Sequence, residues 1–331
     1  MFKRRRVMFK RRFSVFSFLA CVVLLFSAAA AFAQPHDPLY DLCFTGKRGV
    51  AVGYYGTILV SEDAGSKWKQ VPSGTKELLA SISFPDADHG WAVGSNGVIL
   101  ATADGGLTWK QQVSGTTNYL LGVYFVTPQK GWAVGEFGTI LHSQDGGASW
   151  QVQPSGEADL LLEGVRFLNE KKGFVVGEFG SVMTTSDGGA SWTSVLKRAE
   201  EILDIESLGA LRPTLYSLDF QDDKIGVAVG VSGCMLRTPD GGKTWKNITP
   251  LTTNHLYRVK FINGKWYAVG LRGAFLVSAD QGQNWQLVPL PPEVSLSWHY
   301  GLAGNSSGEI FLAGEKGMVF RPQVPAKKEG R

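Results

Sequence analysis

The sequence predicts an all-β protein, a seven-bladed β-propeller of four-stranded blades with Asp-box turns. Three observations lead to this prediction: many glycines, a recurring Val-Gly or Ala-Gly motif, and a tryptophan at a constant distance after that motif. The 41 glycines among 331 residues indicate frequent tight turns between short strands. The motif spacings of 41, 41, 42, 53, 40 and 44 residues fit blades that bury their faces only by stacking around a ring. The motif glycines are Gly53, Gly94, Gly135, Gly177, Gly230, Gly270 and Gly314.

A second motif, Ser/Thr-x-Asp-x-Gly-x-x-Trp, follows six of these glycines, and its tryptophan always lies 15 residues after the glycine. We interpret it as a structural Asp box, in which the carboxylate accepts backbone N–H groups of the turn and the tryptophan packs on the blade. Each aspartate belongs to a separate blade, so these carboxylates do not converge on a calcium or catalytic site. The Asp-box residues are Asp63, Asp104, Asp145, Asp187, Asp240, Asp280, Trp68, Trp109, Trp150, Trp192, Trp245 and Trp285.

Four antiparallel strands, A to D, are expected to run from the centre of each blade outwards. In the second unit they are expected at residues 78–84, 90–94, 97–102 and 109–114. This order puts the A–B turns and the Asp boxes on one face of the ring, and the B–C turns and D–A connections on the other. The seventh unit has no Asp box. We expect residues 34–39 to supply its outer strand, because an open sheet edge is a liability.

Both ends of the chain are expected to lie outside the propeller, which spans residues 34–323. Residues 1–33 have a basic start, an apolar stretch and an Ala-Phe-Ala exit, which is typical of a cleaved secretory signal peptide. An uncleaved membrane anchor is the alternative. We expect an exported protein in a periplasmic or thylakoid lumen-like compartment, or a secreted one, with a polar tail at 324–331. Sec or twin-arginine export and a start at Met1 or Met8 stay open.

Composition narrows the classes of ligand. Without residues 1–33 the chain has 26 Lys and Arg against 29 Asp and Glu, which gives no reason to expect nucleic acid as a partner. The five histidines fall singly without ligand spacing, so we expect no metal, no cofactor, no catalytic residues and no enzyme activity. Cys43 and Cys234 are expected to be free, buried thiols of a monomer.

The face with the B–C turns is the predicted partner surface. Two Glu-Phe-Gly turns place Glu136, Phe137, Glu178 and Phe179 on adjacent blades, and exposed aromatic residues beside charges favour a protein contact. The alternative is that both phenylalanines pack back over the neighbouring blade. An insertion at about 193–212, with apolar residues at helical spacing, is predicted to cap the same face.

Alternate residues of the inner strands are predicted to line the central channel. Arg166, Arg258 and Lys260 would make this lining basic and a second candidate partner site, unless Asp41 and Asp219 neutralise it. The predicted lining residues are Asp41, Cys43, Ser81, Ser83, Tyr124, Arg166, Ser217, Asp219, Arg258 and Lys260.

The export signal and the repeated Gly-Trp-Ala-Val-Gly and Asp-Gly-Gly-x-Thr-Trp units resemble the photosystem II stability/assembly factor family of cyanobacteria and plastids, over about residues 36–322. This resemblance implies a non-catalytic lumenal factor that binds newly made reaction-centre protein, a membrane-complex subunit, through an arginine-rich patch. The candidates for that patch are Arg166, Arg212, Arg258 and Arg272. The alternatives are an Asp-box glycoside hydrolase of the sialidase kind, whose arginine triad we do not find, and a secreted carbohydrate-binding propeller.

Overall fold

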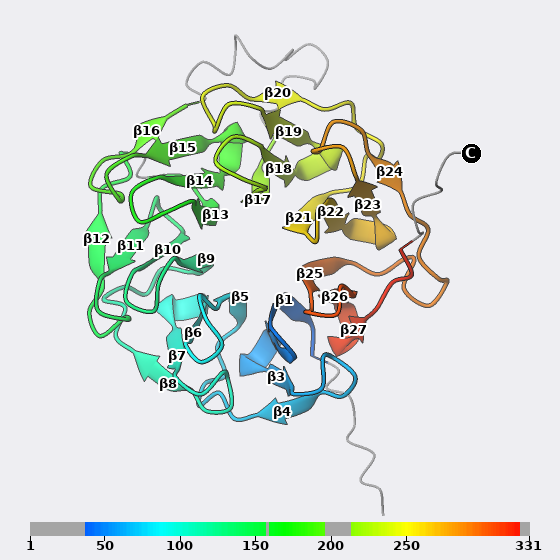
Figure 1. Cartoon of the computed structure of the whole chain (residues 1–331). Coiled ribbons are helices and arrows are strands. Elements are labelled where there is room, and N and C mark those ends of the chain that lie inside the picture. The colour runs from blue at the N-terminus through cyan, green and yellow to red at the C-terminus, as the bar shows by residue number, and fades with distance from the viewer. Residues whose placement is uncertain (1–36, 157–158, 196–212, 325–331) are drawn as a thin grey trace, which may run out of the picture. The chain divides into compact units, whose positions relative to one another are not determined.

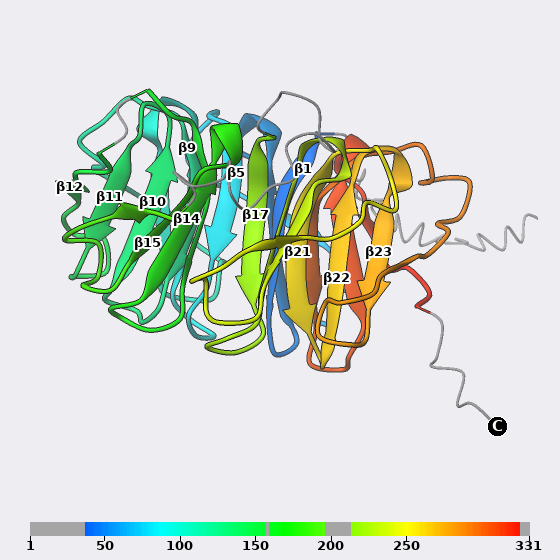
Figure 2. The ribbon, with the colours of Figure 1, turned by 90° about the horizontal axis from the view of Figure 1, so that it is seen from above.

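The computed structural model describes residues 37–156, 159–195 and 213–324. In this part of the chain, seven antiparallel sheets follow one another around a common axis (Figure 1), six of them with four strands and one with three. Figure 2 shows the ring from the side, with the strands running between its two faces. The predicted seven-bladed propeller is therefore confirmed. No helix of the described part is long and apolar enough to cross a membrane.

The first four blades each have four strands. Blade 1 has β1 (Leu39–Thr45), β2 (Arg48–Gly53), β3 (Ile58–Ser61) and β4 (Lys69–Val71). Blade 2 has β5 (Leu79–Ser83), β6 (Gly90–Gly94), β7 (Ile99–Thr102) and β8 (Lys110–Gln112). Blade 3 has β9 (Leu120–Phe125), β10 (Gly131–Gly135), β11 (Ile140–Ser143) and β12 (Gln151–Gln153). Blade 4 has β13 (Leu162–Phe167), β14 (Gly173–Gly177), β15 (Val182–Thr185) and β16 (Thr193–Ser194).

The last three blades complete the ring. Blade 5 has β17 (Leu215–Phe220), β18 (Gly226–Gly230), β19 (Met235–Thr238) and β20 (Lys246–Asn247). Blade 6 has β21 (Leu256–Ile262), β22 (Lys265–Gly270), β23 (Phe275–Ser278) and β24 (Gln286–Leu287), and blade 7 has β25 (His299–Gly304), β26 (Ile310–Gly314) and β27 (Val319–Phe320). Short 3-10 turns join the second and third strands: η1 (Tyr54–Gly56), η2 (Ser95–Gly97), η3 (Glu178–Gly180), η5 (Val231–Gly233), η6 (Leu271–Gly273) and η7 (Glu315–Gly317).

The predicted division into two faces is confirmed by hydrogen bonds between turns. On one face the Asp boxes of blades 1 to 5 meet the A–B turns, as where the N–H of Gly105 donates to the carbonyl of Asp88 at 2.8 Å. On the other face the B–C turn meets the D–A connection, as where the N–H of Glu178 donates to Leu161 at 3.0 Å. A Cβ on the motif glycine Gly177 would collide with the same Leu161 carbonyl, so this close approach requires glycine.

Blade 7 closes the ring by side-to-side packing on blade 1. Leu39, Leu42 and Ala51 of blade 1 share one buried cluster with Phe311 and Ala313 of blade 7. Within the described residues blade 7 has no fourth strand. Residues 37 and 38, the described part of the predicted closing segment before β1, form no strand. The prediction that this segment completes blade 7 is therefore wrong for those two residues, and residues 34–36 lie outside the described part.

Aromatic stacks join neighbouring blades at several of the junctions. Phe167, the last residue of β13, stacks on Trp132 of the preceding blade, with ring centroids 3.4 Å apart and planes 8° apart. The Asp-box Trp192 of its own blade meets the same ring edge-on at 5.9 Å. Phe125 repeats this arrangement between Trp91 and Trp150 one blade earlier. The repeated tryptophans therefore build the junctions between blades.

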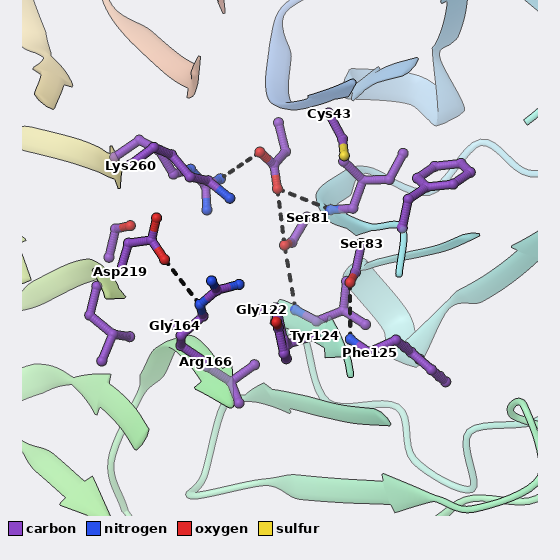
Figure 3. Close-up of a pocket in the computed structure, with 18 of the residues that line it drawn as sticks. Cys43, Ser81, Ser83, Gly122, Tyr124, Phe125, Gly164, Arg166, Asp219 and Lys260 are labelled. Carbon is purple, nitrogen blue, oxygen red and sulfur yellow. Dashed lines mark hydrogen bonds and ion pairs between the residues drawn. The ribbon is translucent and has the colours of Figure 1, made fainter. Parts of the chain in front are cut away.

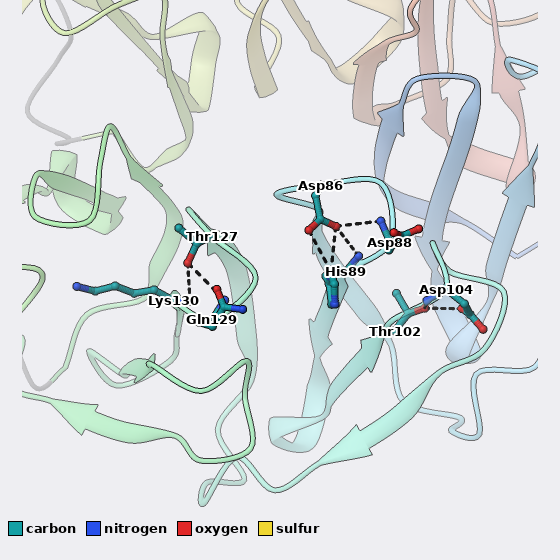
Figure 4. A network of polar contacts seen from close by, with 8 residues as sticks. All are labelled: Asp86, Asp88, His89, Thr102, Asp104, Thr127, Gln129 and Lys130. Carbon is teal, nitrogen blue, oxygen red and sulfur yellow. Dashed lines mark hydrogen bonds and ion pairs between the residues drawn. The ribbon is translucent and has the colours of Figure 1, made fainter.

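The Asp box has the local geometry that its sequence predicts. In all six boxes one carboxylate oxygen accepts the backbone N–H four residues later, at 2.8 to 2.9 Å. Figure 4 shows blade 2, where the Thr102 hydroxyl donates to Asp104 at 2.7 Å. In the neighbouring A–B turn, Asp86 accepts the N–H groups of Asp88 and His89 at 2.9 and 2.7 Å. Both turns of this face are thus held by aspartate side chains.

Every innermost strand carries a β-bulge at its second residue, where the pairing with the next strand skips one position. The first residue of each of these strands is buried, whereas the bulged residue is half-buried. A bulge re-aims the side chain of its extra residue. We call the seven bulged residues the bulge ring: Tyr40, Ala80, Leu121, Glu163, Tyr216, Tyr257 and Tyr300.

The aromatic stacks lead to a first prediction. Phe167→Ala removes a ring that is 1% exposed and lies between two tryptophans, so it should lower the free energy of unfolding by about 3 to 5 kcal/mol. The control is Val113→Ala, at a side chain that is 86% exposed, which should leave stability unchanged. Urea unfolding followed by tryptophan fluorescence measures both. Equal stabilities of the two variants would contradict this role of the stacks.

A second prediction concerns the Asp boxes. Hydrogen bonds from the Ser149 hydroxyl and N–H lower the pKa of Asp145 to about 2. The charged carboxylate therefore stabilises the folded chain above its unfolded pKa of about 4, and this contribution is lost as the pH falls through about 2. Asp145→Ala should unfold at a lower temperature than the unchanged chain at pH 7, and the gap should narrow below pH 4. A gap that stays constant with pH would contradict this explanation.

Candidate functional site: the B–C face and the channel

The two repeated B–C turns expose their phenylalanines. The side chains of Phe137 and Phe179 are 66% and 58% exposed, so the alternative that they pack back over the neighbouring blade is wrong. Both residues have left-handed backbone angles, with φ of 53° and 54°. Tyr54 and Tyr55, in the corresponding turn of blade 1, are 49% and 53% exposed. The B–C face therefore presents aromatic side chains from three blades.

The two glutamates of these turns are held by the backbone. Glu136 accepts the N–H of Tyr119 at 2.9 Å, and Glu178 accepts the N–H of Leu161 at 3.1 Å. Each glutamate thus joins its B–C turn to the D–A connection that leads into its own blade. This structural role was not predicted from the sequence, although Glu recurs before Phe at the same position of both turns.

The remaining predicted residues of this face are only partly described. Arg272 lies in η6 and is exposed on the B–C face of blade 6, with a φ of 50°. Thr193 and Ser194 form β16, the outer strand of blade 4, rather than the start of a helix. The rest of the predicted helical insertion, with Arg212, lies outside the described residues from residue 196 on. A single patch that joins Arg272 to the other arginines stays a prediction.

The inner strands line a central cavity of about 260 Å³, and all ten residues predicted for the lining contribute to it. Figure 3 shows Arg166, Asp219 and Lys260 meeting in this cavity from three blades. Cys43 and Cys234 are both free of a disulfide, as expected. Cys234 is buried, but Cys43 is half-buried in the channel wall, so its expected burial is wrong.

The channel neutralises most of its own charge. Arg166 forms an ion pair with Asp219 at 3.0 Å and lies over the ring of Tyr124, 4.7 Å from the ring centroid. Arg258 forms an ion pair with Asp41 at 3.2 Å. Lys260 has no ion pair with any described residue. The neutralising alternative for Asp41 and Asp219 is therefore confirmed, and the two arginines are not free cations.

The acidic and hydroxyl side chains of the channel also join neighbouring blades. Asp41 accepts the backbone N–H of Ile82 on the next inner strand at 3.0 Å, and Asp219 accepts that of Phe261 at 2.9 Å. The Ser83 hydroxyl accepts the N–H of Phe125 at 2.9 Å. Inner strands are sheet edges, and these contacts satisfy N–H groups that have no strand partner. This second role was not foreseen from the sequence.

A second cavity, of about 200 Å³, lies at the end of the channel where the inner strands begin, on the side of the B–C turns. Its wall consists of the bulge ring with Tyr119 and Arg258. The pKa of Glu163 in this wall is raised to about 7, mainly by burial and also by the charge of Glu178, while Arg258 opposes the shift. The repeat spacing does not reveal Glu163, because only the bulge in β13 turns it into the cavity.

These features define the class of protein: an Asp-box β-propeller with one aromatic face and a polar, internally neutralised channel. No group of three or more metal-ligating His, Cys, Asp or Glu side chains is found among the residues that the structure describes. The family model of the photosynthesis system II assembly factor YCF48 matches residues 60–154, 111–210 and 201–321. These matches together span more than half of the chain. The chain therefore belongs to that family, and the resemblance inferred from the sequence is confirmed.

Known structures have the same fold. "YCF48 bound to D1 peptide" matches with a TM-score of 0.68 at 21% identity, over 88% of this chain and 93% of that chain. YCF48 from Cyanidioschyzon merolae matches with a TM-score of 0.67 at 18% identity, over 88% and 97% of the two chains. The WD40 propeller domain of Doa1 reaches 0.66 at 13% identity, over 89% and 95%. At these identities the likeness shows the fold alone. No curated protein sequence matches.

A third prediction concerns Glu163. In the folded chain the Glu163 carboxyl keeps its proton up to about pH 7, whereas in the unfolded chain it loses the proton near pH 4.3. The free energy of unfolding therefore falls as the pH rises from about 4.3 to above 7. Glu163→Gln should therefore unfold with a free energy about 1 to 3 kcal/mol higher than the unchanged chain at pH 8, and with no difference at pH 4.

Urea unfolding at pH 4, 6 and 8 measures this difference. The control is Glu293→Gln, which removes an exposed carboxylate and should leave stability unchanged at each pH. A variant at Glu163 that is less stable than the unchanged chain at pH 8 would contradict the prediction.

Proposed function

We propose that this protein is a non-catalytic assembly factor that binds a protein subunit of a photosystem II-type membrane complex through its B–C face. The observation that carries the proposal is the match to the YCF48 assembly-factor family. A relative of the same fold has been solved as YCF48 bound to D1 peptide, which supports a protein as the partner. The Asp-box glycosidase and carbohydrate-binding alternatives are not favoured, because the matching family is one of assembly factors.

The B–C face supports this mode of binding. Four large aromatic side chains that are about half or more exposed lie in its turns: Tyr54, Tyr55, Phe137 and Phe179. Aromatic side chains that become buried at an interface often contribute about 2 kcal/mol or more each. The Glu136 and Glu178 carboxylates fix the turns before a partner arrives, so less conformational freedom is lost on binding.

The same proposal includes export and removal of residues 1–33, which leaves the propeller at 34–323 and the polar tail at 324–331. The basic, apolar and Ala-Phe-Ala regions of the N-terminus support it. N-terminal sequencing of the protein purified from its own cells tests it, since the first residue should be Gln34. A periplasmic or lumen-like location and a monomeric state are parts of this proposal.

A fourth prediction tests the partner face. In-cell crosslinking and affinity purification of the full chain should recover a subunit of a membrane complex, and a D1-type peptide serves as the binding probe. The double variant Phe137→Ala with Phe179→Ala should bind this peptide at least about tenfold more weakly, because it loses two exposed aromatic anchors. Its unfolding temperature should stay close to that of the unchanged chain.

The matched control is Lys110→Ala with Lys246→Ala. These exposed side chains directly follow the Asp-box residues Trp109 and Trp245, on the face opposite the B–C turns, and their removal should not change binding. Unchanged binding by the phenylalanine variant, or an equal loss in the control, would contradict the face. It would favour the channel residues Arg166, Arg258 and Lys260 as the partner site.

A further inference from the structure

The bulge ring lines the second cavity, at the B–C end of the channel, with side chains that the propeller fold does not need. In each blade the first residue of the inner strand is buried in the blade junction, and the bulged residue after it is turned into the second cavity. Four of the seven bulged residues are tyrosines, from blades 1, 5, 6 and 7. A half-buried tyrosine is not needed for packing at this position, since blade 2 has Ala80 there.

The four tyrosines form one continuous aromatic wall. Tyr257 stacks on Tyr300 with ring centroids 3.9 Å apart and planes 10° apart. Tyr216 follows at 5.4 Å from Tyr257, and Tyr40 lies 5.5 Å from Tyr300. Tyr119 from blade 3 lines the same cavity. The cavity is thus bounded by the electron-rich rings of five tyrosines.

Glu163 completes this wall from blade 4. Its carboxylate has no hydrogen-bond or ion-pair partner among the described residues, although the charge of Arg258 in the same wall favours its ionised form. The one nearby cation, Arg258, is already paired with Asp41 at 3.2 Å and donates to the Tyr300 carbonyl at 3.1 Å. Glu178 adds a second negative charge close to Glu163. A carboxylate without a partner beside aromatic rings is a site of negative potential.

We propose that the bulge ring binds an organic ammonium cation, with the tyrosine rings around the alkylated nitrogen and the Glu163 carboxylate as its counter-ion. Aromatic rings attract quaternary and alkylated ammonium groups through their negative faces, more strongly when the cation is desolvated. A cavity of about 200 Å³ is smaller than the roughly 300 to 1,000 Å³ of sites for drug-sized ligands, so it suits a single ammonium head group. This site goes beyond the proposed assembly function and does not involve Phe137 or Phe179.

The charge of Glu163 makes binding depend on pH. The described groups that interact with Glu163 electrostatically are Glu178 from η3, Arg258 from β21, and the tyrosines Tyr119, Tyr216 and Tyr300. Burial shifts the pKa of all three tyrosines upwards, so they stay neutral near pH 8. Since the pKa of Glu163 is about 7, the carboxylate is mainly charged at pH 8 and mainly neutral at pH 6. A cation should bind more tightly at pH 8.

The fifth prediction uses choline as the probe and titration calorimetry of the full chain at pH 8 and pH 6. Choline should bind in a saturable way at pH 8 and several-fold more weakly at pH 6. Its neutral isostere 3,3-dimethylbutan-1-ol has the same shape without the charge and should bind at least tenfold more weakly at pH 8. Nα-acetyl-lysine amide, measured in parallel, distinguishes a lysine side chain from a quaternary ammonium group as the preferred source of the cation.

Two variants and one control assign the site. Glu163→Gln and Tyr257→Leu should each weaken choline binding at least tenfold, and Glu163→Gln should also remove the difference between the two pH values. The double variant Phe137→Ala with Phe179→Ala should bind choline as the unchanged chain does, so failure of this site and failure of the partner face are distinguishable.

Three results would overturn the proposal. The first is the absence of binding by both choline and the lysine derivative, and the second is equal binding of choline and its isostere. The third is full choline binding by Glu163→Gln. This variant lacks a buried charge and should fold at least as well as the unchanged chain, so each result is informative.

Discussion

Aromatic stacks across blade junctions, as between blades 2 and 3 and between blades 3 and 4, are the contacts on which the rest of the structure depends. One blade cannot bury both faces of its sheet, and the phenylalanine at the end of an inner strand joins it to the blade before. Phe167 lies between Trp132 and Trp192, and a Cβ on Gly173 would collide with its ring. The glycine that opens the second strand and the Asp-box tryptophan are therefore two halves of one packing unit. This unit fixes the height of β9 and β13 against the preceding blade.

The seven inner strands pair with their second strands in the same register, each with its bulge at the second residue, so they present equivalent positions at equal depth in the channel. Polar residues in the middle of these strands tie blade to blade, as Asp41 does with the N–H of Ile82. The bulged residues, nearer the B–C face, do not connect blades in this way and instead line the second cavity. The end of an inner strand thus packs on the preceding blade, its middle hydrogen-bonds the next blade, and its start lines a candidate ligand cavity.

Sequence periodicity was sufficient for the fold because the 15-residue offset between motif glycine and tryptophan reflects a fixed geometry. All ten residues that it predicted for the channel do line the cavity, since side chains alternate along a strand. It missed Glu163, because a bulge shifts the register by one residue and leaves no mark in the spacing. It could not decide whether Arg166 and Arg258 were free, because their partners come from other blades. For the seventh blade the repeat gave no guide, because the segment before β1 occurs in no other unit, and the expected strand is absent at residues 37 and 38.

The B–C turns show how this scaffold separates structure from recognition. The middle residue of seven such turns has a left-handed backbone, and these residues are Tyr55, Asn96, Phe137, Phe179, Ser232, Arg272 and Lys316. Among them only Asn96 is of a type that adopts this conformation readily, and the others cost roughly 1 to 2 kcal/mol each relative to glycine. The glycine after this residue and the backbone hydrogen bonds of the loop impose the conformation. The Asn96 side chain adds a hydrogen bond to Glu77 at 2.8 Å, whereas the side chains of Phe137 and Phe179 extend into solvent. Large aromatic side chains kept at such strained, exposed positions favour a role outside the fold, in contact with a partner.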